Sequence, residues 1–236
     1  MNPLQAESSS PLYYQLMEKI RSDIERGVYI VGTKIPPEHE LESTYRVSRV
    51  TVRRALQELT EAGFLERKQG KGTFVSVPKI RQDLRNIHSF HDCCKRNGTV
   101  PGTKVISIRE KRADENDCRD LNLPEGSKIL ETVRVRFANG EPVILENNHF
   151  SMAYAYLQDA ELSGSLYRIL ADYGIVPAKA EHEIDMTRIN QDEAKLLEAE
   201  AGTMVLRLRE VIYDQKGRAL HNSNQLIRGD RFTFRI

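Results

Sequence analysis

The chain has 236 residues and is nearly neutral, with 35 Lys and Arg against 34 Asp and Glu. This length allows two domains, and the overall charge favours no class of partner. No apolar run approaches the ~18 residues of a membrane span, and the N-terminus lacks the basic and apolar regions of a signal peptide, so we expect a cytoplasmic protein without membrane contact. Three cysteines and six scattered histidines show neither a disulfide framework nor a metal-ligand spacing, so we expect no metal and no cofactor.

The pattern of residues 11–77 predicts three helices and a hairpin, after a disordered N-terminus over 1–10. Apolar residues recur every four positions in the first helix, which ends at Gly27. The prolines that follow forbid a helix before them and can open a short one over 38–45. The apolar stripe of the first helix consists of Leu12, Leu16, Ile20 and Ile24.

A third helix is predicted from its capping residue Ser48 to about Ala62, and Gly63 ends it. Two short strands follow, "FLERK" and "TFVSV", and the loop "QGKG" joins them. Three helices followed by a hairpin describe a winged helix-turn-helix domain. The residues of the third helix that point inward are Val52, Ala55, Leu56 and Leu59.

Basic residues gather on the opposite side of this third helix. Segment 45–75 holds seven basic residues against three acidic ones. The N-terminal residues of a recognition helix touch base edges in the major groove of DNA. Arg49 can bind guanine through two hydrogen bonds, and Val50 can rest on a thymine methyl group. Arg53 and Arg54 lie toward the same side.

The start of the helix and the wing offer contacts to phosphate. Ser48, Thr51 and the first backbone amides suit phosphate oxygens. Gly70 and Gly72 allow a tight turn, so that Lys71 between them can meet phosphates or the minor groove. The alternative is a solvated helix face beside an ordinary basic loop. Helix spacing, cap, basic face and glycine wing agree within one short segment, which favours DNA binding.

Residues 78–86, "PKIRQDLRN", are interpreted as a polar linker, and residues 87–236 as an α+β domain with a mainly antiparallel sheet. A short helix is expected in "SFHDCCKRN", near the start of this domain, and another over about 165–173.

The second domain contains a weak internal repeat. Its two copies superpose with Asp114 on Asn190 and Gly126 on Gly202. Each copy is expected to form a capped short helix, a Gly turn and a β-hairpin.

The segment "VRVR" of the first copy places Arg134 and Arg136 on one face of a strand. Two adjacent guanidinium groups repel each other unless an anion lies between them. Either the pair lies on an exposed sheet face with cross-strand partners such as Glu146, or it binds an anionic ligand. Residues 80–236 show no nucleophile–base arrangement and no phosphate-binding Gly loop. An enzyme fused to a DNA-binding module is therefore the least favoured interpretation, after a sequence-tolerant architectural DNA-binding protein.

Residues 11–77 resemble the DNA-binding domain of the GntR family of bacterial transcription regulators. The similar segments are "PLYYQLMEKIRSDIERGVYIVGTKIPPEHEL", "VSRVTVRRAL" and "GFLERKQGKGTFV". Pro37 stands where a capping serine is frequent in the family, and His39 where an arginine often contacts DNA. The resemblance implies DNA contacts at Arg49, Thr51, Arg53, Gln69, Gly70 and Lys71.

Residues 80–236 resemble the HutC subfamily, whose effector domain, called UTRA, is similar to the chorismate lyase fold. The landmarks are "HSF", "VRVRFANGEPVILENNHF", "GSLYRIL" and "IRGDRFTF". The resemblance implies a homodimeric, metabolite-responsive repressor that binds operator DNA and a small anionic molecule such as a phosphorylated sugar. Phe232 stands where such relatives often have a tyrosine, and we expect Phe232, His221 and Asn222 to line the effector pocket. The effector residues that the resemblance implies are Ser89, Phe90, Arg134, Arg136, Glu146, Ser165 and Tyr167.

Overall fold

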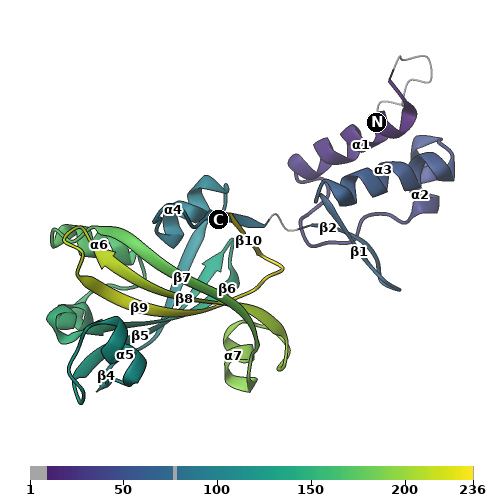
Figure 1. The fold of residues 1–236 in the computed structure, drawn as a ribbon. Coiled ribbons are helices and arrows are strands. Elements are labelled where there is room, and N and C mark those ends of the chain that lie inside the picture. Colours follow the sequence, from purple (N-terminus) through teal and green to yellow (C-terminus); the bar gives the residue numbers. More distant parts are fainter. Residues whose placement is uncertain (1–9, 77–78, 236) are drawn as a thin grey trace. The chain divides into compact units, whose positions relative to one another are not determined.

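The computed structural model describes residues 10–76 and 79–235. They form two compact units that divide after residue 78 (Figure 1). The disordered segment predicted over 1–10 falls almost entirely outside the described residues.

The first unit has three helices and a two-stranded antiparallel hairpin, which confirms the predicted winged helix-turn-helix. Leu16 and Ile20 of the first helix pack with Val52 and Leu56 of the third, and all four side chains are buried. The hydroxyl of Ser48 accepts a hydrogen bond from the Thr51 amide and caps the third helix, as predicted. The elements are α1 (Leu12–Glu25), α2 (Glu38–Tyr45), α3 (Arg49–Glu61), β1 (Leu65–Lys68) and β2 (Gly72–Val75).

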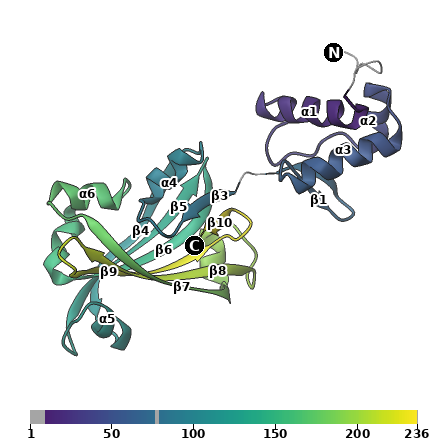
Figure 2. The ribbon, with the colours of Figure 1, turned by 45° about the horizontal axis from the view of Figure 1, so that its top comes forward.

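The second unit is built on an antiparallel sheet of six strands in the order β4-β5-β6-β9-β8-β7 (Figure 2). A separate parallel pair, β3 and β10, joins the two ends of this unit's chain. The strands are β3 (Ile80–Asp83), β4 (Pro101–Arg112), β5 (Lys128–Ala138), β6 (Glu141–Ser151), β7 (Pro177–Arg188), β8 (Met204–Asp214), β9 (Ala219–Ile227) and β10 (Phe232–Arg235).

Helices cover both faces of the sheet. The helices α4 (Phe90–Arg96) and α6 (Leu166–Asp172), with the 3-10 helix η1 (Met152–Asp159), pack on one face. The short helices α5 (Glu115–Asp120) and α7 (Gln191–Leu196) lie on the other face (Figures 1 and 2). The predicted α+β domain with a mainly antiparallel sheet is therefore confirmed.

The internal repeat explains the symmetric strand order. The first copy contributes β4, α5, β5 and β6, and the second contributes β7, α7, β8 and β9. Asp114 and Asn190 each close a capping box at the start of their helix, as their side chains accept backbone amide hydrogen bonds. The two hairpins meet in the middle of the sheet, where β6 pairs with β9.

Two predictions about the ends of the second unit are wrong. The segment interpreted as a linker, 78–86, contains β3, which pairs with β10 so that Ile80 lies opposite Phe232. Phe232, which was expected at the effector, is 2% exposed in a core with Ile80 and stacks on Phe234. The sequence interpretation failed here because this pairing joins segments that lie about as far apart in the domain as the chain allows.

We expect Phe232→Ala to lower the free energy of unfolding of the second unit by about 3–5 kcal/mol, because it removes a buried aromatic ring. Urea unfolding followed by circular dichroism measures this loss. Thr233→Ala, an exposed neighbour on the same strand, is the matched control and should change little. A Phe232→Ala protein as stable as the control would contradict the core position.

Candidate DNA-binding and effector-binding sites

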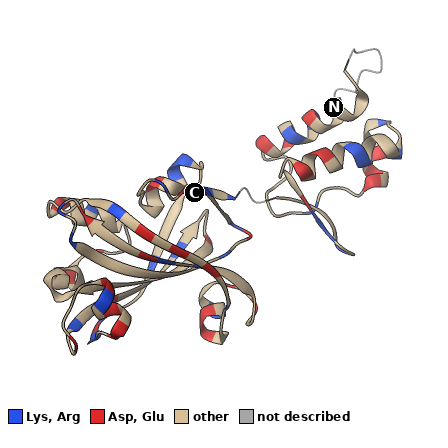
Figure 3. Cartoon of the chain, in the orientation of Figure 1, with Lys and Arg blue, Asp and Glu red and all other residues tan. Residues whose placement is uncertain are grey.

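The recognition helix presents its first residues to solvent. Arg49 and Arg53 are exposed, and Val50 is 76% exposed although it is apolar. Figure 3 shows the basic residues of α3 and of the wing strand β1. Arg54 is engaged differently, because its guanidinium group lies 3.9 Å from the ring centroid of Tyr13 on α1. His39 is exposed on α2.

A carboxylate that the sequence interpretation missed gathers these arginines. Glu38, the first residue of α2, lies 3.4 Å from Arg49, 4.0 Å from Arg53 and 3.9 Å from Arg67 of β1. These exposed pairs contribute little to stability. They hold the side chains of the recognition helix and the wing close together. In the sequence, only its position at the start of a helix distinguished Glu38.

The wing turn requires its glycines. Gln69, Gly70 and Lys71 are exposed, and Gly70 and Gly72 have positive φ angles of 71° and 116°. A Cβ atom on Gly72 would lie 2.4 Å from Cε of Lys34, which the flexible lysine chain can relieve, so it is the positive φ that favours glycine here.

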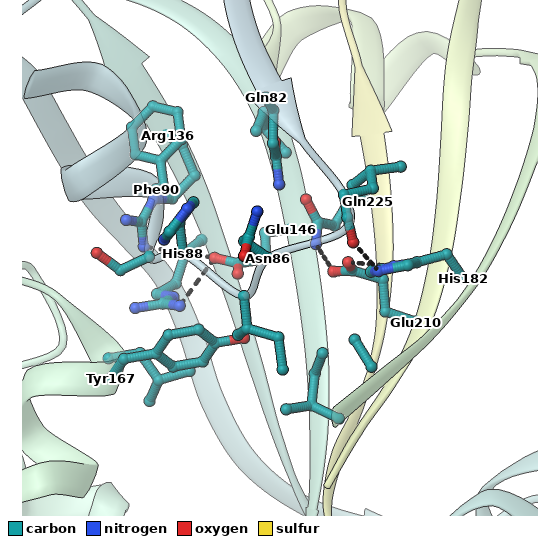
Figure 4. A pocket seen from close by; sticks show the side chains of 18 residues that line it. Gln82, Asn86, His88, Phe90, Arg136, Glu146, Tyr167, His182, Glu210 and Gln225 are labelled. Carbon is teal, nitrogen blue, oxygen red and sulfur yellow. Dashed lines mark hydrogen bonds and ion pairs between the residues drawn. The ribbon is translucent and has the colours of Figure 1, made fainter. Parts of the chain in front are cut away.

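The arginine pair of the second unit is buried rather than exposed. Arg134 and Arg136 are 1% and 3% exposed, which excludes the alternative of a solvated sheet face. Glu146 lies opposite Arg134 on β6, and its Oε2 is 2.8 Å from Nη2 of Arg134 and 3.4 Å from Nη1 of Arg136. The ring of Phe90 stacks 4.7 Å from the guanidinium group of Arg136 (Figure 4).

The charges of this cluster do not cancel. Burial opposes the ionisation of Glu146, but the two guanidinium groups lower its pKa to about 2. Burial lowers the pKa of Arg136 to about 10, against the stabilising effect of Glu146, so Arg136 is still protonated at neutral pH. Among the described residues, Glu146 is the one carboxylate in contact with the two cations, so their contacts leave one positive charge unneutralised.

Two nitrogen atoms of the pair also lack a hydrogen-bond acceptor. Among the described residues, Nε of Arg134 and Nε of Arg136 are buried and have no partner. An unpaired buried donor costs about 1–3 kcal/mol. The cluster is therefore short of acceptor atoms as well as of negative charge.

The arginine pair lines a small cavity of about 60 Å³. This is room for a few water molecules. Its walls come from the segment 82–90, from the start of α6 and from one sheet face. Of the predicted effector residues, Ser89, Phe90, Arg134, Arg136, Glu146 and Tyr167 line it.

Three further predicted residues lie outside the cavity lining. Ser165 precedes the lining residues as the N-cap of α6. His221 is buried behind Tyr167 and Phe150, at ring centroid distances of 6.2 and 5.0 Å. Asn222 points to the other sheet face, where it donates to Asp117. His221 and Asn222 cannot share a pocket because adjacent strand residues point to opposite faces.

The opposite wall of the cavity carries residues that the sequence interpretation missed. Glu210 of β8 lies between His182 of β7 and Gln225 of β9 (Figure 4). The internal repeat could have identified Glu210 as a cavity residue. The superposition that places Gly126 on Gly202 also places Arg134 on Glu210.

One chain carries a winged DNA-binding unit and a sheet unit with a charged cavity. This combination is typical of ligand-responsive transcription regulators. Residues 12–75 match the model of bacterial regulatory proteins of the gntR family, and residues 96–233 match the UTRA domain. The chain belongs to the GntR family, in the HutC subfamily that carries this effector domain.

Similar proteins are transcriptional repressors. The chain is 33% identical to the HTH-type transcriptional repressor NagR of Bacillus subtilis (strain 168), over 97% of this chain and 95% of that protein. It is 31% identical to the histidine utilization repressor of Pseudomonas putida, over 86% and 82%. The crystal structure of PhnF from Mycobacterium smegmatis superposes with a TM-score of 0.74 at 31% identity, covering 95% of this chain and 97% of that one.

These domains and relatives are those of DNA-binding transcriptional repressors and not of enzymes. They confirm the predicted class of protein and do not favour the architectural or the enzymatic alternative. No helix among the described residues is long and apolar enough to cross a membrane.

We expect Arg49→Ala to weaken binding to the operator by about 1–3 kcal/mol and to relax base preference at one position, because a bidentate base contact would be lost. Fluorescence anisotropy with the operator and with single-base variants measures both effects. Arg21→Ala removes an exposed charge from α1 and serves as the control. A uniform loss on every duplex would instead assign Arg49 to the phosphates.

The buried ring of His221 predicts a pH effect on stability. Burial lowers its pKa to about 4 from the usual 6.5. The unfolded chain therefore binds a proton that the folded chain excludes, and His221 alone lowers the free energy of unfolding by about 2 kcal/mol between pH 7 and pH 5. His221→Asn should flatten this dependence in urea unfolding, whereas His39→Asn, at an exposed position, should leave it intact. An unchanged slope in His221→Asn would contradict the excluded proton.

Proposed function

We propose that this protein is a homodimeric repressor that leaves or rearranges on its operator when an anionic small molecule, such as a phosphorylated sugar, binds at Arg134 and Arg136. The observation that carries the proposal is the buried arginine pair with a single carboxylate between its members.

A phosphate group fits what the cluster lacks. It brings negative charge to the uncompensated cation and acceptor oxygens to the two unpartnered Nε atoms. The hydroxyl group of Tyr167 stands at the same cavity and can donate to a further phosphate oxygen, whereas that of Ser89 lines the cavity but donates to Asp92. Burial raises the pKa of Tyr167, so its hydroxyl keeps its proton at neutral pH. Glu146 remains available for the hydroxyl groups of a sugar.

The DNA-binding part of the proposal rests on the exposed start of α3 and the wing. Arg49 and Val50 would read bases in the major groove, while Thr51, Arg53 and Lys71 would contact the backbone. A two-fold dimer would place two such units on two half-sites of a near-palindromic operator. A repressor of this kind works in the cytoplasm, where the operator is.

The position of the cavity suggests how the ligand acts on DNA binding. The chain enters the second unit through β3, and the cavity is lined by Gln82 of that strand and, after it, by Leu84 and residues 86–90. A ligand bound in the cavity would contact this entry segment and would favour the arrangement of the segment that fits it over the unliganded one. The ligand shifts the equilibrium only by its difference in affinity for the two arrangements.

We expect Arg136→Gln to abolish the response of operator binding to the effector while DNA affinity without effector stays nearly unchanged. The reason is that the variant neutralises the uncompensated charge. Fluorescence anisotropy of a labelled duplex from upstream of the protein's own gene, with a panel of phosphorylated sugars and small carboxylates, measures the response. Arg134→Ala should have the same effect, with circular dichroism to verify that the fold persists.

Arg207→Gln is the matched control, because Arg207 pairs with Asp185 on the opposite sheet face. The proposal fails if Arg136→Gln releases DNA at the same ligand concentration as the unmodified protein. Tight operator binding that no compound alters would leave the repressor assignment intact but remove the support for an anionic effector.

A further inference from the structure

The cavity has an acidic side that the anion site does not use. Glu210 is 9% exposed and faces the cavity from β8, on the same sheet face as Arg134. In Figure 4 its carboxylate lies across the cavity from Arg136 and Tyr167. The cavity is thus lined by cationic groups from the first repeat and by an anionic group from the second.

The partners of Glu210 within the described residues are weak for a buried carboxylate. Gln225 donates one hydrogen bond to its Oε2, and Nδ1 of His182 lies 2.8 Å from its Oε1. Gln225 carries no charge. His182 is the single ion-pair partner given by the described residues, and a histidine is charged only when it is protonated.

His182 also contacts the entry segment, residues 82–90, through Leu84. Its Nε2 lies 3.2 Å from the carbonyl oxygen of Leu84, so both ring nitrogens face acceptors. The hydrogen bond with Glu210 raises the pKa of His182, although burial opposes this. The ring donates to both acceptors only in its protonated form, so Glu210 loses its charged partner whenever the ring is neutral.

A carboxylate accepts about four hydrogen bonds, and Glu210 uses two. A charge that is nine-tenths buried requires a charged, hydrogen-bonded partner to offset the loss of water. His182 meets this need only while its ring is protonated, and a cation in the cavity that Glu210 lines would be a second such partner. Hydroxyl groups would supply hydrogen bonds but no charge.

We propose that Glu210 binds an ammonium group of the same effector whose anionic group binds Arg134 and Arg136. The effector is then a compound with a phosphate at one end and an amine at the other. This inference rests on the proposed anion site and specifies the class of ligand that the site selects.

The test compares pairs of flexible probes with the full chain by isothermal titration calorimetry. Each pair consists of an aminoalkyl phosphate and the alkyl phosphate of equal length, and several chain lengths cover the unknown span. We expect the best aminoalkyl phosphate to bind about tenfold more tightly than its alkyl partner, as a charge-assisted hydrogen bond would provide. Glu210→Gln should remove this advantage and leave the affinities for alkyl phosphate and inorganic phosphate unchanged, which also verifies the fold.

Glu183→Gln is the matched control, because Glu183 is an exposed carboxylate of β7 that pairs with Arg209. Equal affinities within every pair, or an amine advantage that survives Glu210→Gln, would overturn the inference while the anion site stands. Failure of all phosphates to bind, inorganic phosphate included, would overturn the anion site and this inference with it.

Discussion

The second unit depends on one carboxylate, Glu146, which lies between two guanidinium groups inside the protein. Removing one partner of a buried ion pair typically costs about 3–5 kcal/mol, because the remaining charge is left uncompensated. Glu146 reaches the arginines only in the observed β5–β6 register, since a slip by one residue would turn it to the opposite face. The same carboxylate therefore fixes the hairpin and leaves the excess of positive charge that can hold an anion.

The internal repeat gives this fold two equivalent walls with opposite chemistry. Arg134 of β5 and Glu210 of β8 occupy corresponding positions, and both face the cavity. Each copy builds one wall of the cavity from the same capped helix and hairpin. The two walls carry opposite charge because the shared position is Arg134 in one copy and Glu210 in the other. The entry segment after β3 forms one wall of the cavity, where a bound ligand would contact it.

Features set by local sequence were predicted correctly. The cap at Ser48, the capped short helices that follow Asp114 and Asn190 and the β-hairpin of each copy depend on residues that lie close together in the sequence. Alternation along one strand also placed Arg134 and Arg136 together. The prediction of the linker failed because β3 is short and polar, and its partner β10 follows about 150 residues later.

The errors at the candidate site have the same cause. Phe232 and Asn222 were placed by resemblance, whereas their positions depend on which strand each one pairs with and on which face it then points to. The cluster around Glu38 joins α2, α3 and β1, so its geometry could not be read from any single helix pattern. Glu210 could have been found from the repeat, since its counterpart Arg134 had already been identified as a binding residue.

If an anion binds at the arginine pair, it accepts hydrogen bonds from the unpartnered Nε groups of Arg134 and Arg136. Nuclear magnetic resonance of the arginine Nε–H groups, during a titration of the full chain with inorganic phosphate and then with the releasing compound, observes these atoms directly. We expect the two buried Nε–H signals, assigned through Arg134→Lys and Arg136→Lys, to shift together as the ligand saturates the protein, while the signal of Arg207 stays in place. Signals of Arg134 and Arg136 that stay unchanged at a ligand concentration that releases the operator would contradict this expectation.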